Sequence, residues 1–312
     1  MKKVSILFVV LMGMVAVSCS NEESLDSSVN LSSEQNAQAP VTVSVSGFSV
    51  EQGDFPGTGD PQGTRGTTRA LTRAQSVSDY SSVKFLTLAF YKSDGTEVYK
   101  ATQEKGNVPE GQTFGEFSTT LPMGSYTMVV VANGGSNVPT LTSATSATYG
   151  ENAVGDTFVK SQEVNITSTE AVNLDATLDR IVTCIAVNST DGRAEEVKKL
   201  RITTTTGSRS FNPTTGLATV NSGITATITH PEAVGTVTKS ASLLFLATDE
   251  QTADVTIETL DEDDNVLFSK TVENVPLKRN RWTVLTGAMY QTTAAGTFSV
   301  NTDWLTNENV NF

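Results

Sequence analysis

The sequence predicts an all-β protein built from antiparallel β-sandwiches, and three observations support this prediction. Beyond residue 40, short runs rich in Val, Ile, Thr and Phe recur throughout the chain. Turn sequences such as SDG at 93–95 and NGG at 133–135 separate these runs and suit positive φ angles or side-chain turn hydrogen bonds. Few stretches have apolar residues at helical spacing. Strands that recur at such short intervals are typical of antiparallel sandwiches.

The N-terminus has the features of a bacterial lipoprotein signal. Lys2 and Lys3 precede an apolar run at 4–17, which is typical of a secretory signal and too short for a membrane-spanning helix. Small residues then lead directly to Cys19, as a lipoprotein peptidase requires. We expect residues 1–18 to be removed and Cys19 to carry acyl chains such as palmitate, which attach a protein to a membrane. The alternative is an ordinary cleaved signal in which Cys19 is incidental.

A tether and a strand follow the predicted anchor. Residues 20–39 are rich in Ser, Asn and Gln and lack aromatics and periodicity, which indicates a flexible tether. Val41, Val43 and Val45 then alternate with polar residues, so the three valines share one face of a predicted strand at 41–50. Such a strand needs a sheet in which to bury that face.

The segment at 52–74 combines Gly, Pro, Thr and Asp with three arginines, Arg65, Arg69 and Arg73, each followed by Gly or Ala. A long loop with basic residues near its end is accessible to proteases. One interpretation is a cleavage site for an arginine-specific protease. The alternative is a solvated linker whose arginines are incidental or bind an acidic surface.

The rest of the chain is expected to form two sandwich domains. We place the boundary at the composition change near 168–173, which gives domains at 74–170 and 171–312 after a segment at 19–73 that holds the tether, the first strand and the loop. Residues 140–153 are a candidate helix because they are rich in Ser, Thr and Ala, and a short helical turn is a second candidate at 193–199. Strands are predicted at residues 83–91, 97–102, 114–121, 125–132, 163–166, 181–188, 198–205, 226–229, 241–247, 253–259, 266–272, 281–286 and 298–304.

Large apolar residues alternate with polar ones near the C-terminus. Phe298, Val300 and Trp304 share one face of the last predicted strand, and Val310 and Phe312 follow it. A segment of this kind could add to a neighbouring molecule as a strand, with backbone hydrogen bonds supplying affinity and alternate side chains filling pockets. The alternative is that it closes the sheet of its own domain.

Composition and charge argue against several functions. The chain carries 21 Lys and Arg against 34 Asp and Glu, a formal net charge of -13, which opposes contact with nucleic acid phosphates. The single histidine, His230, leaves no material for a multi-histidine metal site, and no spacing of carboxylates indicates a catalytic pair. With Cys19 acylated, Cys184 has no cysteine partner and is expected in the core. We therefore expect no enzyme activity, no metal and no cofactor.

Several segments, taken in order, resemble the fimbrillins of Bacteroidales. These segments are the lipobox at Cys19, the Arg73-Ala74 junction ahead of a strand at 83–88, LPMGSY at 121–126 ahead of the strand at 129–133, LDRIV at 178–182 and KRNRW at 278–282. The similarity is diffuse and spans most of the chain, and it depends on the order of the segments rather than on one motif.

This resemblance implies two tandem transthyretin-like β-sandwich domains and a structural role in a type V pilus. Such subunits reach the outer membrane as lipoproteins and are cut by an arginine-specific extracellular protease, here after Arg73 or Arg69. Cleavage would remove the anchor and the strand at 41–50, and residues 298–312 would be the donor strand. The products would polymerise with identical or minor pilus subunits into a cell-surface fimbrium.

Other roles stay open beside the polymerising subunit. Pilus anchor and tip subunits belong to the same family, and a host or bacterial surface ligand for adhesion is possible for each of them. A monomeric surface lipoprotein that binds glycan or a host protein is the alternative from a different class.

Overall fold

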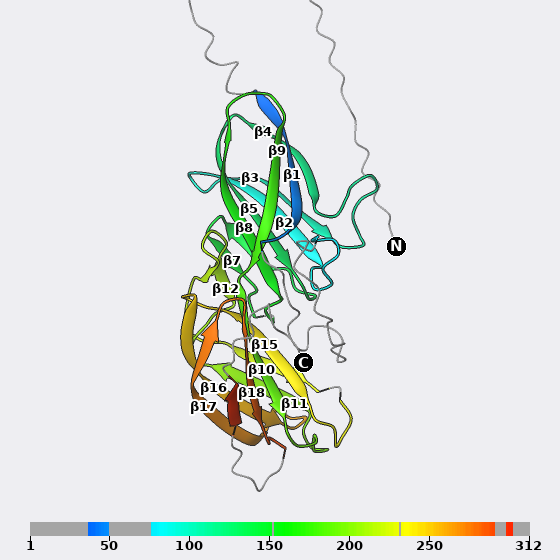
Figure 1. The fold of residues 1–312 in the computed structure, drawn as a ribbon, viewed down its shortest axis with the longest axis vertical. Helices are drawn as coiled ribbons and strands as arrows, with labels where there is room; N and C mark the ends of the chain where they lie inside the picture. Colours follow the sequence, from blue (N-terminus) through cyan, green and yellow to red (C-terminus); the bar gives the residue numbers. More distant parts are fainter. Residues whose placement is uncertain (1–36, 50–75, 152, 231, 291–297, 302–312) are drawn as a thin grey trace, which may run out of the picture.

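The computed structural model describes residues 37–49, 76–151, 153–230, 232–290 and 298–301, and these contain strands but no helix. The all-β prediction is therefore confirmed. No helix long and apolar enough to cross a membrane occurs in this part of the chain. The strands form one seven-stranded sheet and three four-stranded sheets. Figure 1 shows an elongated molecule with the seven-stranded sheet at one end and two of the smaller sheets at the other.

The seven-stranded sheet has the order β3-β2-β5-β8-β9-β1-β4 and folds over on itself. β8 and β9 pair only at the Phe158–Arg180 position and the one beside it, so the sheet bends there into two layers. Side chains of β1, β4 and β9 pack against those of β2, β5 and β8 in one core. The strands are β1 (Gln38–Phe48), β2 (Phe85–Lys92), β3 (Glu97–Glu104), β4 (Glu116–Pro122), β5 (Gly124–Asn133), β8 (Thr157–Ile166) and β9 (Val172–Arg180).

Two four-stranded sheets enclose a second core at the other end of the molecule. This core contains Ile185 and Leu285 from one sheet and Leu200 and Ile257 from the other. One sheet has the order β15-β10-β18-β19, with β10 (Val182–Ser189), β15 (Lys239–Phe245), β18 (Trp282–Gly287) and β19 (Phe298–Asn301). The other has the order β14-β11-β16-β17, with β11 (Lys199–Thr204), β14 (Thr225–Thr229), β16 (Glu250–Leu260) and β17 (Val266–Lys278).

A small sheet and a third core join the two ends. The small sheet has the order β13-β12-β7-β6, with β6 (Thr140–Ser143), β7 (Ser146–Thr148), β12 (Ser210–Asn212) and β13 (Leu217–Ala218). The third core combines Tyr91 and Val129 from the seven-stranded sheet with Cys184 and Phe245 from β10 and β15, so apolar contact is continuous between the ends. The boundary predicted near 168–173 overlaps the start of β9, which pairs with β1 and β8. The division into domains at 74–170 and 171–312 stays a prediction.

Both candidate helices are wrong. Residues 140–153 contain β6 and β7, and residues 193–199 form a turn that leads into β11. Leu141 and Ala147 are buried in the third core, and Ala147 pairs with Phe211 of β12. The threonines of this segment favour strands over helices because their branched side chains are restricted in a helix. Pairing with a distant strand therefore decides the structure here.

Candidate functional site

β1 is the central strand of the layer formed by β9, β1 and β4. It pairs parallel with β9 over residues 41–48 and antiparallel with β4 over residues 38–44. Figure 1 shows β1 in blue beside β9. Because β1 has a partner on each side, the edges of both β9 and β4 depend on it for their backbone hydrogen bonds.

One face of β1 is buried in the core. Its inward residues, each 5 % exposed or less, are Ala39, Val41, Val43, Val45 and Phe48. The predicted alternation places the three valines on that face, as the structure has them. A register shift between Val45 and Gly47 then changes the parity and brings Phe48 to the same face. Burial of each Val or Phe side chain stabilises the fold by about 1.5–3 kcal/mol.

Phe48 contacts two aromatic rings, which we call the aromatic socket. The socket consists of Tyr80, from the turn that precedes β2, and Phe158, the second residue of β8. The Phe48 ring centroid lies 5.0 Å from that of Tyr80 and 4.7 Å from that of Phe158, and the two socket rings are 5.7 Å apart in an edge-to-face arrangement. Such aromatic pairs add about 0.5–1.5 kcal/mol beyond their area burial.

A buried ion pair lies behind the socket. Arg180, the last residue of β9, donates from Nε and Nη2 to the two carboxylate oxygens of Asp156, each at 2.8 Å. Arg180 also donates to the Tyr80 hydroxyl, and its guanidinium lies 4.9 Å from the centre of the Phe158 ring. Burial lowers the pKa of Arg180, but Asp156 and Tyr80 raise it above its usual value, so the side chain stays charged. The pair therefore fixes both socket rings.

The sequence did not identify Phe48, Tyr80, Phe158, Arg180 or Asp156 as site residues. Because of the register shift in β1, Phe48 lies on the buried face although a strict alternation from Val45 would place it on the outward face. Arg180 does lie within the LDRIV segment at 178–182, so a charged residue inside an otherwise apolar run was the available signal.

Several predicted site residues lie outside the described part of the chain. They are Cys19, Arg69, Arg73, Trp304, Val310 and Phe312. The predictions of lipidation, of arginine cleavage and of most of the donor strand therefore stay predictions.

Phe298 and Val300 lie in β19, at the edge of the chain's own sheet. β19 pairs antiparallel with β18, with Val300 opposite Leu285 and Phe298 opposite Gly287. The Phe298 ring contacts Phe268 of β17 at a centroid distance of 6.5 Å. A Cβ atom on Gly287 would lie 2.7 Å from the Phe298 ring, so the absence of a side chain at residue 287 admits this ring.

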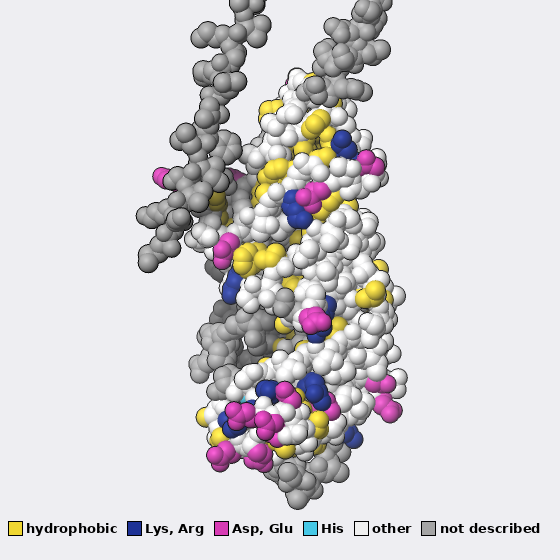
Figure 2. All heavy atoms as spheres, turned by 180° about the vertical axis from the view of Figure 1, so that it is seen from behind, with side chains coloured by type: hydrophobic (Ala, Val, Ile, Leu, Met, Phe, Trp, Pro, Cys, Tyr) yellow, Lys and Arg dark blue, Asp and Glu magenta, His cyan; other side chains and the backbone are white. Residues whose placement is uncertain are grey.

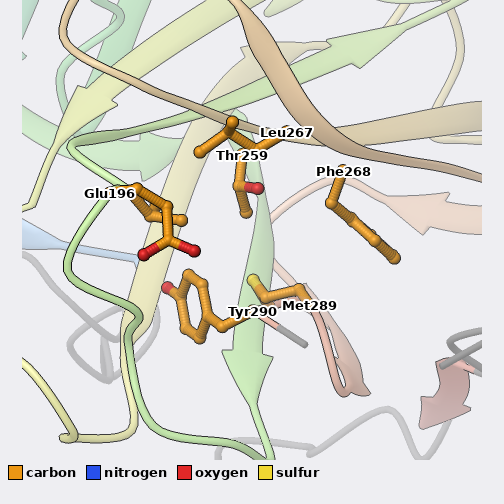
Figure 3. A pocket seen from close by; sticks show the side chains of 7 residues that line it. Glu196, Thr259, Leu267, Phe268, Met289 and Tyr290 are labelled. Carbon is orange, nitrogen blue, oxygen red and sulfur yellow. The ribbon is translucent and has the colours of Figure 1, made fainter. Parts of the chain in front are cut away.

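A small cavity lies between the two sheets near β19. Figure 3 shows Glu196, Thr259, Met289 and Tyr290 converging on it from the turn before β11, from β16 and from the segment after β18, with Leu267 and Phe268 of β17 beside them. The cavity has room for about one water molecule. It is too small for an organic ligand.

His230 is a buried structural residue. Its Nδ1 lies 3.2 Å from a carboxylate oxygen of Glu232, and its Nε2 lies 3.2 Å from the hydroxyl of Tyr290. The Tyr290 hydroxyl also bonds to the hydroxyl of Thr238. Burial lowers the pKa of His230 below its usual value, although Glu232 opposes this shift. The ring nitrogens are thus occupied by neighbours within the fold.

Charged side chains on the described surface form no recognisable binding centre. No group of His, Cys, Asp and Glu suited to a metal ion occurs among the described residues. The Asp261 carboxylate accepts the backbone N–H groups of Asp263 and Asn265, so it stabilises the turn between β16 and β17. Figure 2 shows acidic and basic side chains intermingled at one end of the molecule, without a broad basic patch on that face of the described part.

These features define an all-β protein of packed sheets, mostly antiparallel but with parallel pairs β1–β9 and β10–β18, whose first strand lies between two others. The chain belongs to the DUF6562 family, a family of unknown function, whose model matches residues 54–311. No curated protein matches the sequence.

Solved structures with some similarity come from Bacteroidales proteins. The fimbrial anchor protein Mfa2 of Porphyromonas gingivalis is 10 % identical, with 85 % of this chain and 97 % of that chain covered and a TM-score of 0.47. The C-terminally truncated tip fimbrial protein Mfa3 of the same organism is 9 % identical, with 84 % and 99 % covered and a TM-score of 0.37. A proposed cell adhesion protein of Bacteroides ovatus is 14 % identical, with 86 % and 99 % covered and a TM-score of 0.44. No functional property follows from similarities of this size.

Proposed function

We propose that this protein is a structural subunit of a cell-surface fimbrium. In this proposal it is exported as a lipoprotein through Cys19, cut after Arg73 or Arg69, and polymerised by strand exchange. The removed strand is β1, and the donor is the C-terminal segment at 298–312 of another subunit. The subunit needs no catalytic residue, metal or cofactor for this role.

The position of β1 is the observation that supports this proposal most. β1 lies between β9 and β4 and buries Val41, Val43 and Val45 in the core. The segment that joins β1 to the rest of the fold is nevertheless the one that contains three arginines. A cut in that segment would turn β1 into a separate strand held only by hydrogen bonds and apolar contacts. Neighbouring strands lie about 4.8 Å apart, so its departure would leave a gap of about 10 Å between two strand edges.

Such a gap is a strong acceptor for another strand. The backbone groups of β9 and β4 that face β1 would lose their partners, and the floor of the gap would expose apolar core. A strand with alternating apolar residues would restore both the hydrogen bonds and the burial. The C-terminal segment has this alternation at Phe298, Val300, Trp304, Val310 and Phe312.

The first experiment is mass spectrometry of the N-terminus and of acyl groups on protein taken from the cell surface. A chain that starts at Ala74 or Ala70 without lipid is expected, together with a ladder of polymers on gels of unboiled samples. The variant with Arg65→Gln, Arg69→Gln and Arg73→Gln should stay monomeric and lipidated, whereas the matched control with Arg65→Gln alone should polymerise.

The alternatives predict different results in the same experiment. An acylated Cys19 on the surface form would favour a pilus anchor or a monomeric lipoprotein that binds a glycan or host protein. A cleaved chain that caps polymers of other subunits and forms none alone would favour a tip subunit.

A further inference from the structure

We propose that the aromatic socket of Tyr80 and Phe158 selects the strand that replaces β1 by receiving an aromatic side chain, and that this side chain is Trp304 of a second copy of the chain. This inference rests on the proposed strand exchange. It adds the register of the incoming strand and the residue that fixes it.

Among the inward residues of β1, Phe48 is the aromatic one, and it packs on the two rings of the socket. The other inward residues of β1 are alanine and valines, whereas Phe48 is 2 % exposed and packs on two rings at 5.0 and 4.7 Å. Once β1 leaves, both socket rings lose this cover. An aliphatic replacement would lose the edge-to-face contacts, so an aromatic ring is preferred.

The socket keeps its shape when β1 is absent, because its braces come from elsewhere in the fold. Tyr80 is held by a hydrogen bond from Arg180, and Arg180 is held by Asp156 through two bonds of 2.8 Å. None of these residues belongs to β1 or to the arginine-containing segment. A preformed site binds its ligand without the cost of ordering side chains first.

Burial along β1 decides which aromatic residue of the C-terminal segment fits. With Trp304 in the place of Phe48 and the strand running as β1 does, steps of two residues place Thr302, Val300, Phe298 and Gly296 over Val45, Val43, Val41 and Ala39. Gly296, the smallest residue of the incoming strand, then replaces Ala39, the smallest inward residue of β1. Opposite the three residues from Val45 to Phe48, β9 advances by only two, from Ala176 to Leu178, so an incoming strand without the bulge keeps this register.

The two other registers are unfavourable. With Phe298 in the place of Phe48, Gly296 and Ala294 would replace Val45 and Val43 and leave cavities in the core. With Phe312 in the place of Phe48, Glu308 would face inward at the position of Val43, which is fully buried, and Trp304 would replace Ala39. An unpaired carboxylate in an apolar core is strongly disfavoured. Trp304 is therefore the anchor residue.

The test uses the full chain after cleavage by an arginine-specific protease. The cleaved protein is incubated with excess synthetic peptide, and release of the fragment that carries β1 is followed by size-exclusion chromatography. Three peptides span residues 295–312: the native sequence, the Trp304→Leu variant and the Phe312→Leu variant. Two further peptides span residues 38–49: the native sequence and the Phe48→Leu variant.

We expect Trp304→Leu and Phe48→Leu to lower the affinity of their peptides for the cleaved protein by about tenfold. Phe312→Leu should change this affinity less than about twofold. Equal affinity of the native and Trp304→Leu peptides would contradict the proposed role of the aromatic socket but not the proposed strand exchange. Failure of every peptide, native 38–49 included, would overturn both.

A protein-side variant gives a second measurement. Phe158→Leu should reduce the difference in affinity between the native and Trp304→Leu peptides, because one of the two rings that contact the Trp304 side chain is then missing. If this variant does not fold, the peptide series alone decides the outcome.

Discussion

The guanidinium of Arg180 and the carboxylate of Asp156 form a two-bond ion pair in which each side chain is only 2 % exposed. The pair joins the start of β8 to the end of β9, at the corner where the seven-stranded sheet changes layer. A buried pair of charges must satisfy its hydrogen bonds within the fold, and Tyr80 accepts one of those that remain. The corner of the sheet therefore depends on this pair.

Removal of one partner should be costly. We expect Asp156→Asn to lower the free energy of unfolding by about 3–5 kcal/mol, because Arg180 would then be a buried charge without its counter-ion. The matched control is Asp264→Asn, which breaks the exposed pair with Lys199 and should cost no more than about 1 kcal/mol. Urea denaturation of both variants measures the difference, and equal losses would contradict the role assigned to the buried pair.

The alternation of Val41, Val43 and Val45 was enough to predict the buried face of β1, because side chains in a strand alternate strictly. The same rule missed Phe48, since a bulge adds one residue before it. The Arg180–Asp156 pair could not be predicted either. The two residues are 24 positions apart and meet only because β8 and β9 pair at two positions.

Residues 140–153 show a different limit. The sparse apolar residues Leu141 and Ala147 gave no clear period. Their strands β6 and β7 pair with each other, and β7 also pairs with β12, more than sixty residues later in the chain. Local sequence carries no information about such a partner. The general class, all-β, was predictable because it depends on many short strands rather than on any one pairing.

Stability should decrease in mild acid because of His230. Its pKa is lowered in the folded protein by burial, so between the usual value of about 6.5 and the lower folded value the unfolded chain binds more protons. This contribution to stability is complete above about pH 6.5 and is lost as the pH falls through the folded pKa. The slope should not exceed about 1.4 kcal/mol per pH unit.

His230→Gln should flatten this dependence, because the amide can bond to Glu232 and Tyr290 but does not titrate. Unfolding free energies at pH 7, 6 and 5 would be compared for the two proteins. An unchanged slope would show that another group is responsible.

The contact between Gly287 and Phe298 should control the attachment of β19. Gly287→Ala would place a Cβ atom 2.7 Å from the Phe298 ring, which must then move away from β18. We expect faster hydrogen exchange in β18, whose free edge β19 covers. Ser299→Ala on β19 is the control, because this exposed side chain makes only a long bond of 3.4 Å to the Thr286 carbonyl oxygen, and it should change exchange much less.

A double variant tests whether the ring itself is responsible. Phe298→Ala loses the same ring contacts, so Gly287→Ala should add little further effect in the Phe298→Ala background. Full additivity of the two substitutions would mean that Gly287 acts elsewhere in the fold.

Val43 and Thr42 are neighbours on opposite faces of β1. Substitutions at these two positions test whether β1 is bound mainly through its buried face. Val43→Thr buries a hydroxyl in place of a methyl group at a fully buried site and should cost about 1–3 kcal/mol of stability. Thr42→Val changes the outward, partly exposed face and should stay within about 0.5 kcal/mol of the native protein.

After arginine cleavage the same pair of variants should differ in how long β1 stays bound. The strand is then held by its buried side chains, by two ladders of backbone hydrogen bonds and by the bonds of Ser46 to Asp175 and Ser49 to Asp179, and both variants keep all of these hydrogen bonds. The Val43→Thr strand should therefore be released about 5- to 100-fold faster than the native one, in line with its lost binding energy, whereas Thr42→Val should be released at the native rate. Size-exclusion chromatography of the cleaved proteins follows this release. Equal rates for all three proteins would mean that β1 is held by something other than the valine face.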